Sequence, residues 1–208
     1  MKREEKMKRM GFFGGSFNPP TYAHINIAKA SIEKLGLDKF FFVPVGNLYN
    51  KPDLIDEVYR YDMLKIACKN ENNIFVEDIE LKKSRNLSAI EVFEMIENKY
   101  KKDNDIAIFF VMGADNFIKL PNWKNAKELI TKYQYIIFER NNSNLRSQIE
   151  ENELLNKNKF NFHILKLEDY SQISSGNIRT LIKNNDYERC KEFTKPEIIE
   201  YIKMNKLY

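Results

Sequence analysis

The segment from Gly11 to His24 combines residue types that bind phosphate. Its sequence, GFFGGSFNPPTYAH, ends an apolar run in paired glycines and then places a serine, two prolines and a histidine at the start of a helical pattern. Glycines let a backbone approach an anion closely, and the following helix presents its positive end. The spacing matches neither GxGxxG nor GxxxxGKS, which disfavours a dehydrogenase and a Walker-type ATPase. Taken alone, Gly14-Gly15 is equally compatible with an ordinary tight turn.

Thr21 and His24 favour the phosphate interpretation of this segment. They stand three residues apart at the start of the predicted helix, which puts both side chains on one face, toward the glycine turn. The other histidine, His163, lies in the apolar run FHILKL. We expect it to be a core or strand-edge residue rather than a ligand.

A second segment, ISSGNIR from Ile173 to Arg179, has a similar character. Its two serines can cap a helix, and Arg179 lies one turn in, where its guanidinium can hold phosphate oxygens. By itself this segment is also compatible with a capped helix and a solvent-exposed arginine. Two anion-binding helix starts in one α/β sheet are expected to cluster at the carboxyl ends of the strands.

Hydrophobic patterning predicts the elements that position these segments. Short apolar runs alternate with longer stretches of helical period, which is typical of a Rossmann-like, doubly wound parallel sheet with helices on both faces. Strands are expected near residues 9–13, 39–44, 74–79, 106–112, 134–138 and 162–166. Helices are expected at 25–35, 59–68, 89–100 and 126–130, and a solvated loop and helix within 139–159. A C-terminal helical segment should contain helices at 177–182 and 196–204, with Thr194 as the cap of the second.

Length and composition predict one globular domain over residues 1–208, with 1–9 as a mobile tail and about 173–208 as the C-terminal helical part. The chain is 43% hydrophobic and 31% charged, and its net charge of +4 is too small and too evenly spread to indicate a nucleic-acid partner. No apolar run reaches the roughly 20 residues that cross a membrane, and MKREEKMKRM lacks the apolar stretch of a signal peptide. We therefore expect a cytoplasmic protein with no membrane partner. The oligomeric state is left open.

GGSFNPPTYAH together with ISSGNIR resembles the nucleotidyltransferase superfamily that has a (T/H)xGH-type motif and an ISSTxIR motif. More narrowly, the chain resembles the nicotinate or nicotinamide mononucleotide adenylyltransferases. The segments FVPVGNLYNKPDL, VYRYDML and VMGADNFIKLPNW follow one another in that family's order, and EIIEYIKMNKLY is similar to its C terminus. The likeness covers the chain from Met10 onward.

The resemblance implies a role for each site residue. Three residues contact the ATP phosphates and carry catalysis: Thr21, His24 and Arg179. The other ATP-binding positions are Gly14, Gly15, Ser16, Phe17, Lys51, Gly113, Asp115, Ser174 and Ser175, with Gly113 and Asp115 at the ribose. Trp123 stacks on the pyridine ring, and Ser88 and Lys124 lie near the pyridine carboxylate. Lys51 and Arg60 match basic positions near the phosphates. The alternatives are solvated cations for these two and a core anchor for Trp123.

The implied reaction is adenylyl transfer from ATP to nicotinate mononucleotide, giving deamido-NAD and pyrophosphate. Because the attacking 5′-phosphate is already an anion, no general base is needed, and the protein aligns two anionic substrates and neutralises developing charge. Mg²⁺ is expected to travel with ATP, held by phosphate oxygens and water, and no metal-binding residues are assigned because the sequence shows no carboxylate cluster.

Departures from the family pattern keep other substrates open. Thr21 stands where many members have histidine, Ala23 replaces glycine and Gly176 replaces threonine, and none of these removes a required charge. NLSAI at 86–90 replaces a Ser-Tyr-Thr stretch, and Lys124 replaces a tyrosine, so nicotinamide mononucleotide, or both substrates, is the first alternative. A pantetheine-phosphate adenylyltransferase would lack the combination of ISSxxIR with GAD and Trp123, and a non-catalytic nucleotide sensor could dispense with His24 or Arg179. A nucleic-acid-binding protein would need clustered basic and aromatic residues, whereas lysine and glutamate interleave here.

Overall fold

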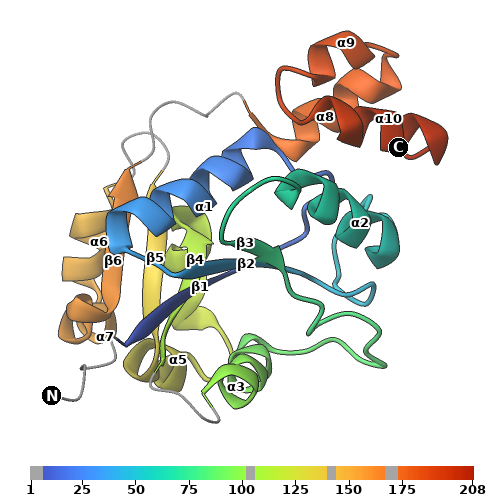
Figure 1. Ribbon diagram of the computed structural model, residues 1–208. Coiled ribbons are helices and arrows are strands. Elements are labelled where there is room, and N and C mark those ends of the chain that lie inside the picture. Colours follow the sequence, from blue (N-terminus) through green and yellow to red (C-terminus); the bar gives the residue numbers. More distant parts are fainter. Residues whose placement is uncertain (1–6, 102–105, 140–143, 167–172) are drawn as a thin grey trace, which may run out of the picture.

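The computed structural model describes residues 7–101, 106–139, 144–166 and 173–208. In this part of the chain six strands form one parallel sheet in the order β3-β2-β1-β4-β5-β6 (Figure 1). The strands are β1 (Lys8–Gly15), β2 (Lys39–Pro44), β3 (Ile74–Val76), β4 (Ile106–Gly113), β5 (Gln134–Glu139) and β6 (Phe162–Lys166). The direction of the strand order reverses between β1 and β4, so this is the point where a doubly wound sheet opens a crevice.

Helices cover both faces of the sheet, as the alternating pattern predicts. α1 (Tyr22–Leu35) and α2 (Glu57–Cys68) lie on one face, and α3 (Ala89–Tyr100) and α5 (Ala126–Lys132) lie on the other (Figure 1). α8 (Ser175–Lys183), α9 (Tyr187–Cys190) and α10 (Pro196–Met204) gather beside α2 at one end of the molecule. The remaining elements are α4 (Ala114–Lys119), η1 (Leu120–Asn122), α6 (Leu145–Glu151), α7 (Glu153–Lys157) and η2 (Lys159–Asn161).

Each face of the sheet has its own apolar core, and β1 contributes to both. Phe12 packs with Tyr100 of α3 and Phe110 of β4 on one side, whereas Phe13 packs with α1 and β2 on the other. Successive side chains of a strand point to opposite faces, so a strand covered on both sides is a continuous apolar run. Because such runs stand out in the sequence, the positions of the central strands could be predicted.

The predicted fold class is confirmed, with corrections at element ends. β3 stops at Val76 rather than at residue 79. α1 begins at Tyr22 and α8 at Ser175, earlier than the apolar periodicity indicated, because Thr21 and Ser174 act as N-terminal caps. α4 was not expected. The polar stretch within 139–159 includes α6 and α7, which bury Leu145, Ile149 and Leu155.

Two further expectations need correction. Thr194 is not the cap of α10: the N-cap position belongs to Lys195, and the buried Thr194 hydroxyl donates instead to the carbonyl of Pro20 at 2.8 Å. β1 begins at Lys8, so residues 8 and 9 belong to the sheet rather than to a tail, and residues 1–6 lie outside the described part of the chain. His163 is half-buried on the edge strand β6, as expected. No described helix has the length and apolar composition needed to cross a membrane.

Candidate active site

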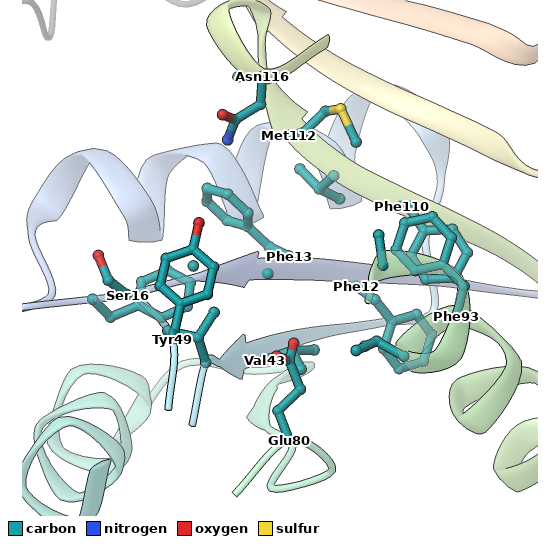
Figure 2. Close-up of a pocket in the computed structure, with 18 of the residues that line it drawn as sticks. Phe12, Phe13, Ser16, Val43, Tyr49, Glu80, Phe93, Phe110, Met112 and Asn116 are labelled. Atoms are coloured by element: carbon teal, nitrogen blue, oxygen red, sulfur yellow. The ribbon is translucent and has the colours of Figure 1, made fainter. Parts of the chain in front are cut away.

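A pocket of about 590 Å³ opens at the carboxyl ends of β1 and β4, where the strand order reverses. Ligands of open α/β sheets bind at this point of the fold. Nine of the residues predicted as site residues line it, namely Gly14, Gly15, Ser16, Phe17, His24, Lys51, Gly113, Asp115 and Trp123. Figure 2 shows Ser16 and Tyr49 toward one end of the pocket and the rings of Phe93 and Phe110 toward the other.

The loop after β1 is shaped by its two glycines. A Cβ at Gly14 would meet no heavy atom within 4 Å, so this exposed position leaves open space on the pocket side. A Cβ at Gly15 would come within 2.9 Å of the ring of Phe17, which is buried and has a φ of 44°. Gly15 therefore allows the Phe17 ring to fold under the loop, where it packs edge-on against the ring of His24.

His24 is oriented by Thr21 in a reciprocal cap at the start of α1. The backbone N–H of Thr21 donates to His24 Nδ1 at 2.9 Å, and the Thr21 hydroxyl lies 2.9 Å from the same nitrogen. Because Nδ1 accepts from a backbone N–H, we assign the proton of the neutral ring to Nε2, which makes His24 a hydrogen-bond donor. Thr21 is only 2% exposed and does not line the pocket, so it reaches the pocket only through its contact with His24.

Three cations surround the segment from Ser16 to Asn18. Lys51 Nζ donates to Ser16 Oγ at 2.7 Å, and Arg179 Nη1 donates to the carbonyl of Asn18 at 2.9 Å. Burial lowers the pKa of Lys51, and the positive charges of Arg179 and Arg60 lower it further. The loop therefore sits in a positive field that suits an anion.

Arg60 supports this loop from beneath. The residue is 0% exposed, and its guanidinium donates to the backbone carbonyls of Ser16 at 3.1 Å, Val45 at 2.6 Å and Ile55 at 2.9 Å. It is absent from the pocket lining. The basic position that the resemblance placed near the phosphates thus supplies charge and loop shape through buried backbone contacts.

The ISSGNIR segment lies against the loop after β1, so the two predicted anion-binding segments do meet. Ser174 caps α8 by accepting from the N–H of Asn177, and Ser175 Oγ donates to the carbonyl of Pro19 at 2.7 Å. Neither serine nor Arg179 lines the pocket. Ser175 and Arg179 use part of their hydrogen-bonding capacity to hold the turn at Asn18 and Pro19, and Ser174 uses its hydroxyl oxygen within α8.

The far end of the pocket is apolar and aromatic. Its wall is formed mainly by Phe12, Val43, Leu87, Val92, Phe93, Ile96, Phe110 and Met112. Trp123, half-buried at the end of η1, packs against this core and also lines the pocket. The ring of Trp123 is therefore partly core and partly pocket surface, so its packing against the core does not exclude contact with a ligand.

Ser88 and Lys124 do not reach the pocket. Lys124 is exposed. Ser88 is the N-cap of α3, and its N–H and its hydroxyl donate hydrogen bonds to Glu91 Oε2 at 2.8 Å and 2.7 Å. Hydrogen bonds from Arg85 and Ser88 hold the pKa of Glu91 well below its usual range. Leu87 and Ala89, on either side of Ser88, line the pocket instead.

Comparison with known proteins agrees with this geometry. A profile described as cytidylyltransferase-like matches residues 12–181. The chain is 35% identical over 204 residues to a probable nicotinate-nucleotide adenylyltransferase of Clostridium acetobutylicum, covering 97% of this chain and 100% of that one. It is 33% identical to a protein of the same description from Clostridium novyi, covering 86% and 90%.

The chain belongs to the cytidylyltransferase-like family. Within it, the chain belongs with the nicotinate-nucleotide adenylyltransferases, which are nucleotidyltransferases of NAD biosynthesis. The solved structure of Plasmodium falciparum nicotinic acid mononucleotide adenylyltransferase complexed with NaAD superposes with a TM-score of 0.79 at 22% identity, covering 97% of each chain. That likeness confirms the fold.

Several pocket residues of this adenylyltransferase-family chain were not predicted from its sequence, and Glu80 is the most notable. Figure 2 shows its carboxyl group directed into the pocket beside Val43. Burial raises the pKa of Glu80 to about 7, against the opposing effect of the Arg60 charge.

Glu57 holds the loop that carries Glu80. The buried Glu57 carboxylate accepts from the N–H groups of Asn47 and Lys82, at 2.8 Å each, and so ties the loop after β3 to the loop after β2. Such a tertiary contact leaves no local signal in the sequence.

The donor set of the pocket does not form a metal cage. Within the described residues, no three His, Cys, Asp or Glu side chains come together as metal ligands would. A cation that arrives bound to nucleotide phosphates requires no such cage, because phosphate oxygens and water supply its ligands.

Proposed function

We propose that this chain transfers the adenylyl group of ATP to nicotinate mononucleotide and releases deamido-NAD and pyrophosphate. The observation that carries this proposal is the composition of the pocket at the β1–β4 crevice. One end holds a glycine loop surrounded by cations, and the other holds an aromatic wall. Two substrates that each combine phosphate with a flat heterocycle fit such a pocket, and the names of the full-length relatives support this choice.

ATP would place its phosphates along the loop from Gly14 to Phe17. The backbone of Gly14 offers close approach, and Lys51 lies at the rim through its contact with Ser16. Asp115, exposed on the first turn of α4 and lining the pocket, can accept hydrogen bonds from ribose hydroxyls. We assign Gly113, Asp115 and the loop to the ATP half of the site.

In the reaction a 5′-phosphate oxygen of the mononucleotide forms a bond to the α-phosphorus of ATP. The bond from that phosphorus to the oxygen bridging to the β-phosphate breaks, and pyrophosphate leaves with the electron pair. The attacking oxygen is already anionic, so His24 has no proton to remove. Its Nε2–H would instead donate to charge developing on the phosphates, and Lys51 and Arg179 would contribute positive charge.

Mg²⁺ is proposed to enter with ATP rather than as a protein-bound ion. The chemistry it supplies is neutralisation of triphosphate charge, as in other nucleotide-dependent transfers. What this chain contributes is alignment: Lys51 and Arg179 orient the anions, and the glycine loop holds the triphosphate against the start of α1.

Nicotinate mononucleotide is preferred over the amide in this proposal because the relatives' names specify nicotinate. Of the described residues that line the pocket, Lys51 is the only lysine or arginine. Since Lys51 contacts Ser16 at the phosphate end, the pyridine carboxylate would be bound by backbone N–H groups rather than by a side-chain cation.

A substrate panel tests the proposal. Purified protein with ATP and Mg²⁺ is supplied in turn with nicotinate mononucleotide, nicotinamide mononucleotide or phosphopantetheine, while pyrophosphate and the adenylylated product are measured. We expect the highest kcat/KM with nicotinate mononucleotide. A higher value with the amide would overturn the substrate assignment, and nucleotide binding without pyrophosphate release would favour a sensor.

A further inference from the structure

The turn from Asn18 to Pro20 is held from outside by the C-terminal part of the chain. Three consecutive backbone carbonyls of the turn each accept a hydrogen bond from a side chain beyond residue 173. The pairs are Arg179 with Asn18 at 2.9 Å, Ser175 with Pro19 at 2.7 Å and Thr194 with Pro20 at 2.8 Å.

The turn needs such support because of its composition. Pro19 and Pro20 have no backbone N–H, so they cannot donate to the hydrogen bonds that normally tie a turn together. The described hydrogen bonds to the turn use its three carbonyls and the amide side chain of Asn18. Asn18 and Thr194 are each only 1% exposed, so their hydrogen bonds form away from solvent.

The side chain of Asn18 carries a fourth connection, to Tyr208. The Tyr208 hydroxyl donates to Asn18 Oδ1 at 2.9 Å, and Asn18 Nδ2 donates to the carbonyl of Asp53 at 2.7 Å. Asp53 lies two residues after Lys51, whose ammonium contacts Ser16. Asn18 therefore joins Tyr208 to both loops of the phosphate end, the one after β1 and the one after β2.

We propose that Tyr208 is a positioning residue for adenylyl transfer, acting through Asn18 to fix the relative placement of Ser16 and Lys51. The part of this inference that concerns adenylyl transfer rests on the proposed function. Tyr208 is absent from the pocket lining and its one hydroxyl hydrogen is used by Asn18, so we assign it no contact with either substrate. Burial raises the pKa of its hydroxyl against the opposing charges of Arg179 and Arg60, so the group stays protonated and donates at neutral pH.

Tyr201 provides a matched control on the same C-terminal segment. Its hydroxyl donates to Asp62 Oδ2 at 3.0 Å and so joins α10 to α2, with no contact to the Asn18 turn. Tyr201→Phe and Tyr208→Phe each remove one hydroxyl that donates to a side-chain oxygen. A difference between the two variants therefore reports on the turn rather than on the general packing of the C-terminal segment.

The first test is steady-state kinetics of both variants with ATP and nicotinate mononucleotide, alongside thermal unfolding. We expect Tyr208→Phe to lower kcat/KM for ATP about tenfold, because small misplacements of a phosphate site are costly. Its KM for the mononucleotide should stay within about twofold of wild type, and Tyr201→Phe should leave both constants within about twofold. Equal kinetic constants for the two variants would overturn the proposal.

A double-mutant comparison asks whether Tyr208 acts through Asn18. In an Asn18→Ala background, Tyr208→Phe should cause no further loss of kcat/KM, since the acceptor of the hydroxyl is already gone. An additional tenfold loss in that background would show that Tyr208 acts by another route and would overturn the assignment.

Hydrogen exchange supplies a readout that does not depend on the reaction. Backbone amides of residues 14–24 and 47–55 should exchange faster in Tyr208→Phe than in wild type, and at the wild-type rate in Tyr201→Phe. If the wild-type protein shows no adenylyl transfer, the proposed function fails, and the exchange data still decide whether Tyr208 fixes the loops. Unchanged exchange in Tyr208→Phe would overturn the positioning role.

Discussion

The two ends of the pocket are built in different ways. At the phosphate end, the loop after β1 is held by side chains from distant parts of the chain, among them Lys51, Arg60 and Arg179, and each makes a specific hydrogen bond. At the aromatic end, where we propose that the pyridine ring binds, the wall consists of apolar and aromatic side chains from β1, β2, α3 and β4, together with Trp123 after η1, that pack as part of the sheet's core. Positioned charge governs the first end and shape governs the second, so changes at the two ends should affect different substrates and different kinetic constants.

The largest effect is expected at the phosphate end, from His24→Ala. A donor aimed at phosphate charge in the transition state commonly contributes about a hundredfold or more to turnover. We expect kcat to fall by about that factor, with KM for nicotinate mononucleotide little changed. Because His24 also accepts from the Thr21 N–H, loss of this cap should lower the unfolding free energy by about 1 kcal/mol. Near-normal turnover of the folded variant would remove His24 from the phosphate site.

Arg179→Lys should have the next largest effect. A lysine at this position could keep one hydrogen bond to the Asn18 carbonyl, but it could not hold that carbonyl and a phosphate oxygen together as a guanidinium can. We expect kcat/KM for ATP to fall about tenfold or more. The measurement is the ATP dependence of pyrophosphate release, with Arg189→Lys as a control, since Arg189 of α9 forms an ion pair at 3.6 Å with Asp186, the N-cap of the same helix. If the two lysine variants behave alike, Arg179 does not contact the triphosphate.

At the aromatic end, Trp123→Ala should weaken binding of the mononucleotide while leaving ATP binding intact. Stacking of a heterocycle on an aromatic side chain contributes about 1–3 kcal/mol, which corresponds to a rise in KM of roughly 5- to 150-fold. Trp123→Phe keeps a ring and should recover most of the loss. Fluorescence of wild-type Trp123, the only tryptophan in the chain, should be quenched by nicotinate mononucleotide. If the KM for ATP rises as much as the KM for the mononucleotide, Trp123 does not belong to a part of the pocket that binds the mononucleotide alone.

A different division, between local features and tertiary contacts, explains what the sequence could predict. The glycine turn, His24 and the serine cap of α8 are local features, in which the residues that make the structure are neighbours in the chain. The resemblance predicts that Ser88 and Lys124 lie near the pyridine carboxylate. In the structure the N–H and the hydroxyl of Ser88 both donate to Glu91 in the cap of α3, so the helix cap uses the groups that this prediction assigns to the substrate.

The partners of residues that act through tertiary contacts could not be predicted from the sequence. Arg60 has the spacing of an ordinary helix residue, yet it donates to carbonyls 15 and 44 positions away. Thr194 has the spacing of a helix cap, but its hydroxyl reaches Pro20 across 174 positions. No periodicity or propensity carries information about such distances, and only the folded sheet brings these groups together.

Glu80 lies between the two ends, and its titration gives the smallest expected effect. Burial raises its pKa to about 7, so the carboxyl is neutral below that pH and negatively charged above it. The same pocket contains the cation Lys51 and the acidic Asp115, and it must bind two anionic substrates. Raising the pH from 6 to 8 should therefore add a repulsive charge and increase the KM of the substrates about two- to threefold.

Glu80→Gln separates this effect from other titrations, because the variant keeps the shape of the side chain without its charge. The KM of each substrate for Glu80→Gln should not change from pH 6 to 8.

The pKa of Glu80 also predicts how the stability of the folded protein depends on pH. A folded-state pKa raised from 4.5 means that the stabilising contribution of the neutral carboxyl is complete below pH 4.5 and is lost as pH rises through about 7. Glu80→Gln should therefore unfold at a higher temperature than wild type at pH 8, with the difference narrowing toward pH 6. A wild-type KM without pH dependence, or a variant less stable than wild type at pH 8, would show that the Glu80 carboxyl is not held in its neutral form by the pocket.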